Sequence, residues 1–182
     1  MKLHSDKFVF VNFNNRHANF SLANLPFYKD NLFYTTSDGT ILETSDSVSD
    51  LGVTFSEDLS WTFHISSIVK KARQKAGWVL SSFKDRSRLT MITLYKSLIR
   101  SLLEYCCPLW MGLNVNNICE LESVQRSFTN KIKCPPSITN YWERLRHLHL
   151  MSLQRRRERY AILHVWKIVN GLVSNDMNTI FL

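Results

Sequence analysis

The spacing of hydrophobic residues changes along the chain, from strand-like runs in the first third to a helical period afterwards. The segments 7–13, 32–42 and 47–55 are rich in β-branched and aromatic residues, and this composition predicts strands. Asp38-Gly39 divides the segment 32–42, and this dipeptide favours the positive backbone angles of a tight hairpin turn. Gly52 in the third segment indicates that another backbone comes close to it. We therefore expect a small antiparallel sheet at the N-terminal side of the chain.

From Trp61 onward the apolar positions predict about five helices. The first apolar stripe is formed by Trp61, Ile65, Ile68, Ala72, Ala76, Val79 and Phe83. Later stripes predict helices over 88–105, with Ile92, Tyr95, Ile99 and Leu102 inward, over 117–133, after Asn140, and from Ser152 to Gly171. Asn140 suits an N-cap position, the last helix is expected to start after Ser152, and Gly171 suits the position that follows a last helical turn. Ser87 is expected to cap the helix over 88–105. The predicted fold class is α+β, with a small antiparallel β-sheet or hairpin at the N-terminus followed by a bundle of about five α-helices.

The last predicted helix and the tryptophans are expected to supply core. Residues 160–169 are apolar almost all round, apart from His164 and Lys167, so we expect this half of the helix to be buried between other helices. We also expect the five tryptophans to pack in the core rather than to stack on nucleobases.

Composition adds a marked charge asymmetry to this picture. The chain has 182 residues, 45% hydrophobic and 21% charged, which excludes a wholly disordered or low-complexity protein. The formal net charge is +8, but residues 1–60 hold four basic and eight acidic residues, whereas residues 61–182 hold 19 basic and seven acidic residues. A polyanionic partner is therefore predicted for the second part only. Basicity alone fits RNA, DNA and an anionic membrane surface equally well.

Cysteine usage and the absence of targeting signals bear on the compartment. The four cysteines include no C-x-x-C pair and are too few for a disulfide scaffold, so we expect reduced thiols. The opening residues 1–7 lack the apolar run of a signal peptide, and no apolar stretch approaches the ~20 residues that span a bilayer. These features predict an intracellular protein, cytoplasmic or nuclear, without a membrane partner.

No residue pattern predicts a catalytic or metal site. The chain contains no G-x-S-x-G motif and no phosphate-binding glycine motif. His147 and His149 are two residues apart, as are Glu120 and Glu122, so on a helix the members of each pair point about 200° apart. Such pairs do not converge on one ion or one reacting atom. We expect no catalytic residue, no metal ligand and no cofactor in this chain.

Basic side chains recur at helical spacing in two of the predicted helices. They are Lys70, Lys71, Arg73 and Lys75 on the first helix, and Arg155, Arg156 and Arg159 at the start of the last. Such rows can follow a phosphate backbone, with guanidinium groups that grip oxygens in pairs. They are also typical of solvated helix faces, or of ion pairs with acidic neighbours such as Glu143 and Glu158. We take the listed residues as candidate nucleic-acid ligands.

A series of short motifs over residues 50–171 carries a resemblance to a known family. In order, these are Asp50–Val53, Phe63–Ile65, Lys71–Ala72, Leu94–Leu98, Leu103–Cys106, Leu109–Trp110, Leu121–Arg126, Tyr141–Leu145, Leu153–Arg157, Lys167–Ile168 and Asn170–Gly171. The ordered set resembles the C-terminal, post-palm part of reverse transcriptases from jockey-type non-LTR retrotransposons. One such motif alone is weak, whereas the whole series in this order is specific.

The resemblance implies a division of the chain into two regions. Residues 1–58 are similar to the palm edge and the primer-grip region, and residues 59–182 are similar to a thumb-like basic helical bundle. In this family the thumb holds the template–primer through basic helices, so that the primer 3′ end meets the catalytic metals. The separate strongly basic part of this chain agrees with that assignment.

The catalytic residues of that family are not found in this sequence. In the family, Mg²⁺ is held in the palm by a Tyr/Phe-Ala-Asp-Asp turn and an upstream Asp. Residues 1–182 contain no Asp-Asp and no Ala-Asp dipeptide. We therefore expect Met1 to be an internal start or a truncation point, and we expect the chain alone to be inactive as a polymerase.

The expected function is that of a fragment of an RNA-directed DNA polymerase that binds template–primer nucleic acid weakly and without sequence preference. The missing palm and fingers would be its protein partner, and their removal is expected to uncover an apolar face near Phe8, Phe10 and Phe33. Two alternatives stay open at this point. One is a co-opted helical protein-interaction module, and the other is a transposon relic without a selected function.

Overall fold

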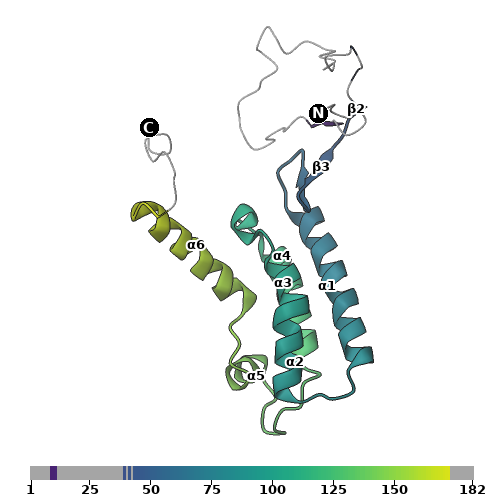
Figure 1. Cartoon of the computed structure of the whole chain (residues 1–182), viewed down its shortest axis with the longest axis vertical. Coiled ribbons are helices and arrows are strands. Elements are labelled where there is room, and N and C mark those ends of the chain that lie inside the picture. The colour runs from purple at the N-terminus through teal and green to yellow at the C-terminus, as the bar shows by residue number, and fades with distance from the viewer. Residues whose placement is uncertain (1–8, 12–38, 40, 42, 173–182) are drawn as a thin grey trace. The chain divides into compact units, whose positions relative to one another are not determined.

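The computed structural model describes residues 9–11, 39, 41 and 43–172, and it has the α+β fold that the sequence predicts (Figure 1). The chain divides into two compact units, Met1–His64 and Ile65–Leu182. The described strands belong to the first unit. The second unit is helical.

Two short strand pairs form the described part of the first unit. β1 (Val9–Phe10) pairs in parallel with β2 (Glu43–Thr44). β3 (Ser47–Asp50) pairs antiparallel with β4 (Val53–Ser56). The β3–β4 hairpin is therefore the small antiparallel sheet of the predicted fold class.

The segment 47–55 forms this hairpin and not the single strand that the sequence predicts. Leu51 and Gly52 make the two-residue turn, with φ angles of 47° and 82°. Two successive positive φ angles match the twist of paired strands, so Gly52 serves the turn. A leucine rarely adopts a positive φ, so the sequence gives no sign of a turn at Leu51. The hairpin predicted over 32–42 lies outside the described residues, apart from Gly39 and Ile41.

Helix α1 (Thr62–Ser82) has the apolar stripe that the sequence predicts. Its buried members are Ile65, Ile68, Ala72, Ala76 and Val79, which recur every three or four residues. Trp61 and Phe83, which lie just outside the two ends of the helix, are only half-buried.

The second predicted helix contains a π-helical segment. α2 (Arg88–Leu94) continues into η3 (Tyr95–Ile99), which has the wider π turn, and then into α3 (Arg100–Glu104). The buried stripe is Met91, Tyr95, Ile99 and Leu103, with each member 0% exposed. A π turn holds more residues than the ~3.6 of an α-turn, so Tyr95 and Ile99, four residues apart across η3, stay on the same buried face. The predicted stripe was therefore wrong at its two ends, Ile92 and Leu102.

Three further helices complete the described part of the second unit. They are α4 (Val115–Thr129), α5 (Tyr141–His147) and α6 (Leu153–Val169). The 3₁₀ turn η4 (Cys107–Trp110) precedes α4 and buries Trp110 completely. The helix predicted over 117–133 thus starts and ends earlier than its apolar pattern indicates.

Side-chain caps fix where these helices begin. The side-chain oxygens of Asn140 and Ser152 accept the backbone N–H groups of Trp142 and Arg155, at 3.1 Å and 3.3 Å. Each bond satisfies one of the N–H groups that a first helical turn leaves unpaired. The predicted cap at Asn140 and the predicted start of α6 after Ser152 are confirmed, and Gly171 has the expected positive φ of 65° after α6. The cap predicted at Ser87 is wrong in one respect, because its side chain makes no capping hydrogen bond to a backbone N–H of α2.

The C-terminal half of α6 is exposed, contrary to the prediction that it is buried. Ile162, Val165, Trp166 and Val169 are 69%, 59%, 54% and 67% exposed. Helix α6 contacts α4 and η4, and its buried residues lie in its first half. Its C-terminal end diverges from the other helices of the unit (Figure 1). Apolar composition predicts burial only where the fold supplies a partner, and the described part of the chain leaves this half uncovered.

Candidate nucleic-acid interface

A buried polar network joins the helices that frame the candidate site. Tyr95 Oη donates to Gln125 Oε1 at 2.6 Å, and Gln125 Nε2 donates to Tyr141 Oη at 3.0 Å. Tyr141 Oη donates in turn to Glu122 Oε1. The backbone N–H of Leu153 donates to Glu122 Oε2 at 3.0 Å. The network therefore connects η3, α4, α5 and the first residue of α6.

Glu122 places a buried carboxylate at the N-terminus of α6. The positive end of the helix and the two hydrogen bonds from Leu153 and Tyr141 stabilise its charge. Burial and the bond to Glu122 raise the pKa of the Tyr141 phenol, and burial raises the pKa of Tyr95 well above its usual value. Both tyrosines therefore remain protonated donors at neutral pH.

The members of this network come from the motifs that carry the family resemblance. Tyr95 belongs to the motif 94–98, Glu122 and Gln125 belong to 121–126, and Tyr141 belongs to 141–145. Segments that are separate in sequence thus meet in one buried cluster. These motif residues account for helix packing rather than for a reacting group.

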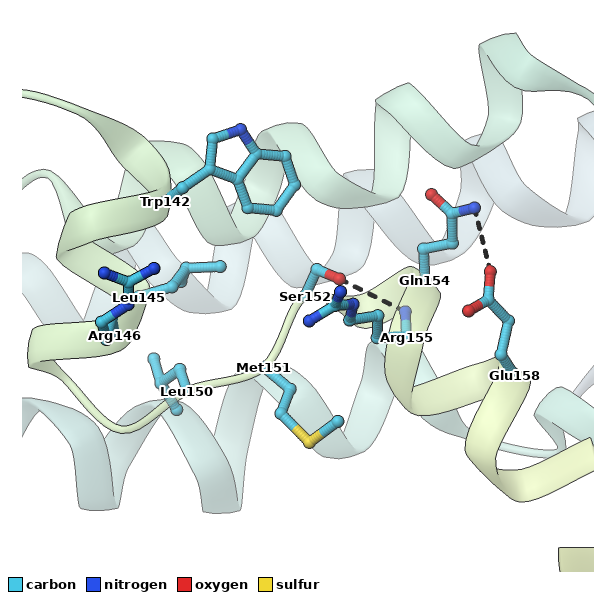
Figure 2. Close-up of a pocket in the computed structure, with 9 residues that line it drawn as sticks. All are labelled: Trp142, Leu145, Arg146, Leu150, Met151, Ser152, Gln154, Arg155 and Glu158. Carbon is cyan, nitrogen blue, oxygen red and sulfur yellow. Dashed lines mark hydrogen bonds between the residues drawn. The ribbon is translucent and has the colours of Figure 1, made fainter. Parts of the chain in front are cut away.

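Two adjoining pockets open on the surface that α4, α5 and α6 form. The larger has a volume of about 600 Å³ and lies between α5 and α6 (Figure 2). Its lining residues are Trp142, Leu145, Arg146, Leu150, Met151, Ser152, Gln154, Arg155 and Glu158. The smaller, of about 250 Å³, shares Trp142, Ser152 and Gln154 with it and extends to α4. The larger pocket falls within the ~300–1,000 Å³ that is typical of ligand sites.

Arginines from four helices surround these pockets. Arg146 of α5 and Arg155 of α6 line the larger pocket, and Arg126 of α4 lines the smaller. Arg73 of α1 donates from Nη2 to Oγ of Ser123, a residue that lines the smaller pocket, at 2.9 Å. All four side chains are exposed. We call Arg73, Arg126, Arg146 and Arg155 the arginine surface.

Acidic residues reduce but do not cancel the charge of the arginine surface. Glu158 lines the larger pocket, and its carboxylate accepts a hydrogen bond from Gln154 Nε2 at 3.1 Å. Glu122 lines the smaller pocket, but its charge is already held by the buried network. The four guanidinium groups therefore leave the two pockets with a net positive charge.

The predicted ligands on α1 divide between two sides of that helix. Residues two apart point about 160° away from each other, so Arg73 faces α4 whereas Lys71 and Lys75 lie on the opposite flank. Lys75 Nζ lies 5.3 Å from the centre of the Trp78 ring. Lys70 lies one turn before Arg73, on the side of the helix that Arg73 occupies. All four basic side chains are exposed, but only Arg73 reaches the arginine surface.

The predicted ligands on α6 differ in their surroundings. Arg155 and Arg159 are exposed and lie one turn apart. Arg156 is half-buried and holds Glu104 through two bonds, Nε to Oε1 at 2.5 Å and Nη2 to Oε2 at 3.1 Å. Arg156 is therefore engaged within the fold, with a partner on α3 that the sequence does not indicate, and we leave it out of the proposed interface.

Three of the tryptophans are exposed, contrary to the prediction that all five pack in the core. Trp78, Trp142 and Trp166 are 53%, 57% and 54% exposed, whereas Trp110 is 0% exposed and Trp61 is half-buried. Trp142 lines both pockets beside the arginine surface. A large exposed aromatic ring next to cations is the arrangement with which proteins stack unpaired bases.

Sequence reasoning did not select Arg126, Arg146 or Trp142. Trp142 and Arg146 are four residues apart in the helix that Asn140 caps, so they share one helix face. The Arg126 guanidinium carbon lies 4.7 Å from the centre of the Tyr141 ring. The spacing of Trp142 and Arg146 was a usable signal, but the approach of α4, α5 and α6 is visible only in the fold.

The described residues also include side chains of the kinds that ligate metals or react as thiols. Among them, no set of three or more His, Cys, Asp or Glu side chains is arranged to hold a metal ion. The four cysteines are free thiols, and burial raises the pKa of Cys107, which disfavours its reactive thiolate. No helix in the described ranges has both the length and the apolar character needed to span a bilayer.

Comparisons of the chain with models of protein families, with curated proteins and with solved structures found no match. A function for this chain is therefore argued from its sequence motifs and from the geometry of its second unit.

Proposed function

We propose that this chain binds nucleic acid through the arginine surface, as a thumb-like region that positions a template–primer duplex without catalysing its extension. The observation that carries the proposal is the convergence of Arg73, Arg126, Arg146 and Arg155 from four helices around two adjoining pockets. The resemblance of the motif series to the C-terminal part of a reverse transcriptase supports the same role. In that role the chain is a fragment of an RNA-directed DNA polymerase, and the palm and fingers are its protein partner.

The chemistry of the arginine surface suits phosphate oxygens. A guanidinium group is planar, keeps its charge and donates in a fork that matches two oxygens of one phosphate. Phosphate contacts fix the position of a nucleic acid without reading its sequence. Lys70, Lys71, Lys75 and Arg159 extend the positive field along α1 and α6. Binding is therefore expected to be independent of sequence.

Salt dependence provides the first test of this proposal. Each neutralised phosphate releases condensed counterions, so four arginine–phosphate contacts on a duplex give a log–log slope of about −3.6. Between about 50 and 200 mM salt the affinity for a primer–template duplex should then fall by roughly 100-fold. Fluorescence anisotropy with a labelled duplex measures this. An affinity that stays flat over the same range would overturn the proposal.

Paired charge reversals test where the duplex binds. Arg146→Glu with Arg155→Glu should weaken duplex binding at least about tenfold more than the control pair Lys84→Glu with Arg88→Glu. Both double variants change the net charge equally, but only Arg146 and Arg155 line a pocket. Lys84 and Arg88 are exposed and lie near the α1–α2 connection. Circular dichroism should show unchanged helical content in both variants. Equal losses of affinity would mean that net charge alone accounts for binding.

The other flank of α1 can be tested in the same way. Lys71→Glu with Lys75→Glu reverses the same number of charges beside Trp78. A loss of affinity larger than that of the Lys84/Arg88 control would include this flank in the interface. A loss equal to the control would restrict the interface to the arginine surface.

A protein-interaction module is the second candidate, and the exposed half of α6 favours it. Ile162, Val165, Trp166 and Val169 follow the i, i+3, i+4, i+7 spacing with which an amphipathic helix packs on a partner. The apolar face predicted near Phe8, Phe10 and Phe33 lies outside the described side chains. Only the α6 residues therefore support this candidate.

Light scattering separates the two candidates. If the α6 surface mediates association, the chain should self-associate with rising concentration, and Ile162→Glu with Trp166→Glu should return it to a monomer. Both substitutions lie outside the arginine surface, so nucleic-acid affinity should change little. A wild-type chain that remains monomeric at all concentrations argues against the second candidate.

A further inference from the structure

Trp142 exposes more than half of its surface at a pocket wall. It lies in the first turn of α5, directly after the Asn140 cap, and is 57% exposed. Its ring centre is 5.1 Å from that of Tyr141, which is itself buried. The two rings are tilted by 55° to each other, and the indole is part of the pocket lining (Figure 2).

The rest of the pocket lining includes two cations, an apolar wall and one carboxylate, that of Glu158. Arg146 lies one turn after Trp142 on α5, and Arg155 reaches the pocket from the first turn of α6 (Figure 2). Leu145 and Leu150 are buried and line the pocket with apolar surface. The pocket thus combines a flat aromatic ring, an apolar wall and two guanidinium groups within about 600 Å³.

We infer that this pocket binds one unpaired nucleotide, with the base stacked on Trp142 and the adjacent phosphate held by Arg146 and Arg155. A nucleotide unites a flat aromatic ring with an anion, which is the combination that this lining complements. The inference rests on the proposed function and makes it more specific. The substrate class becomes a duplex with a single-stranded extension rather than a blunt duplex.

The base in the pocket must be unpaired because stacking requires a free face. Inside a duplex each base has its faces covered by its neighbours, so a duplex presents to Trp142 only its backbone and groove edges. A single-stranded extension leaves successive bases free to stack on aromatic side chains. Arg73 and Arg126 of the arginine surface then hold the duplex by its phosphates, while the pocket, with Arg146 and Arg155, holds the first nucleotide beyond it.

The test compares the full chain with Trp142→Leu on three labelled nucleic acids of equal duplex length. One is blunt, one carries a short single-stranded extension, and one carries the same extension with abasic sites. The wild-type chain should bind the extended duplex about 5- to 150-fold more tightly than the blunt one, which is the range for stacking of one base on an aromatic side chain. The abasic extension should lose this advantage without any change to the protein.

Trp142→Leu should bind all three nucleic acids with nearly the affinity that the wild-type chain has for the blunt duplex. Trp142→Phe should restore part of the preference, because an aromatic ring is present again. Trp166→Leu is the matched control, since it removes an equally exposed tryptophan that does not line the pocket. That control should keep the full preference for the extension. DNA and RNA extensions are compared in parallel to identify the sugar that the pocket prefers.

The outcomes separate this inference from the proposed function. A salt-dependent affinity for the blunt duplex, with no advantage for a base-bearing extension over the abasic one, overturns the nucleotide pocket and leaves the proposed function standing. Equal preference in the wild-type chain and Trp142→Leu also overturns it. Absence of salt-dependent binding to every nucleic acid overturns both.

Discussion

Consecutive arginines at the start of α6 occupy three different environments. Arg155 is exposed at the pocket, Arg156 holds Glu104, and Arg157 is buried with its guanidinium carbon 5.9 Å from the centre of the Trp110 ring. Burial lowers the pKa of Arg157, and the hydrogen bond to Glu104 raises the pKa of Arg156. Each residue along a helix turns by about 100°, so neighbours in sequence face different surroundings.

Substitution of Arg156 should therefore lower stability, whereas substitution of Arg155 should lower nucleic-acid affinity. Arg156→Ala leaves the Glu104 carboxylate without its two charged hydrogen bonds, and we expect a loss of about 2 kcal/mol in the free energy of unfolding, with little change in nucleic-acid affinity. Arg155→Ala should leave stability nearly unchanged and weaken binding. Urea unfolding and anisotropy measure the two effects. Equal stability losses in the two variants would contradict this division.

The buried tyrosines make stability depend on alkaline pH. Because the pKa of Tyr95 is raised in the folded chain above its usual value of 10.0, the unfolded chain loses this proton first. The contribution of Tyr95 is therefore fully present below pH ~10 and falls as the pH rises further. Urea unfolding at pH 8 and at pH 11 should show a smaller loss in Tyr95→Phe than in the wild-type chain. A loss of equal size would contradict the prediction.

At the level of elements, caps decide where α5 and α6 begin. Ser152→Ala removes the acceptor of the Arg155 N–H, and we expect a loss of about 1 kcal/mol in the free energy of unfolding. Ser127→Ala is the matched control, because Ser127 is exposed inside α4, where alanine has the higher helix propensity. Thermal or urea unfolding measures both variants. An equal change in the two would show that the Ser152 cap contributes nothing.

Elements governed by local chemistry could be predicted from the sequence. The caps at Asn140 and Ser152 and the apolar stripe of α1 depend on residues within a few positions of each other. The β3–β4 turn was missed because Leu51 adopts a positive φ that its residue type disfavours. The π segment Tyr95–Ile99 was missed because apolar residues at α-helical spacing fit the same sequence nearly as well.

The exposed half of α6 shows a different limit of prediction. Its apolar residues suit burial, but whether a partner helix reaches them depends on packing over the whole second unit. The prediction that Trp142 packs in the core is wrong for the same reason. It rests on the size and apolarity of tryptophan, and these say nothing about where α5 lies in the fold. The sequence does not indicate which apolar residues are exposed. Both candidate functions depend on this exposure, at Trp142 in the nucleic-acid interface and at the end of α6 in the protein-interaction module.

At the level of the whole molecule, binding should not depend on a divalent metal. The arginine surface supplies the positive charge itself, so the phosphates need no bridging cation. Adding EDTA at constant ionic strength should leave duplex affinity unchanged, and the chain with Mg²⁺ and nucleotides should not extend a primer. Anisotropy and a primer-extension assay test the two statements. Binding that requires Mg²⁺ would contradict the first, and primer extension would contradict the second.

The candidate site could be predicted only in part, because it is assembled from separate segments. Arg73 and Arg155 belong to the helical rows that the sequence predicts. Arg155 lines the larger pocket, and Arg73 bonds to Ser123, which lines the smaller one. Arg126 and Arg146 join them only because α4 and α5 pack beside α6. Charge rows along one helix are visible in a sequence, whereas charge gathered across helices requires the fold.

The buried carboxylate of Glu122 has a consequence for recognition itself. It accepts hydrogen bonds from Tyr141 at the start of α5 and from the first backbone N–H of α6, so both walls of the larger pocket share one anchor. The backbones of the two walls are therefore held in place before a guest arrives, so the entropy lost on binding comes from exposed side chains such as Arg146 and Arg155 rather than from the helices. Stacking on Trp142 can then add to affinity, because none of its free energy is spent on bringing the two helices together.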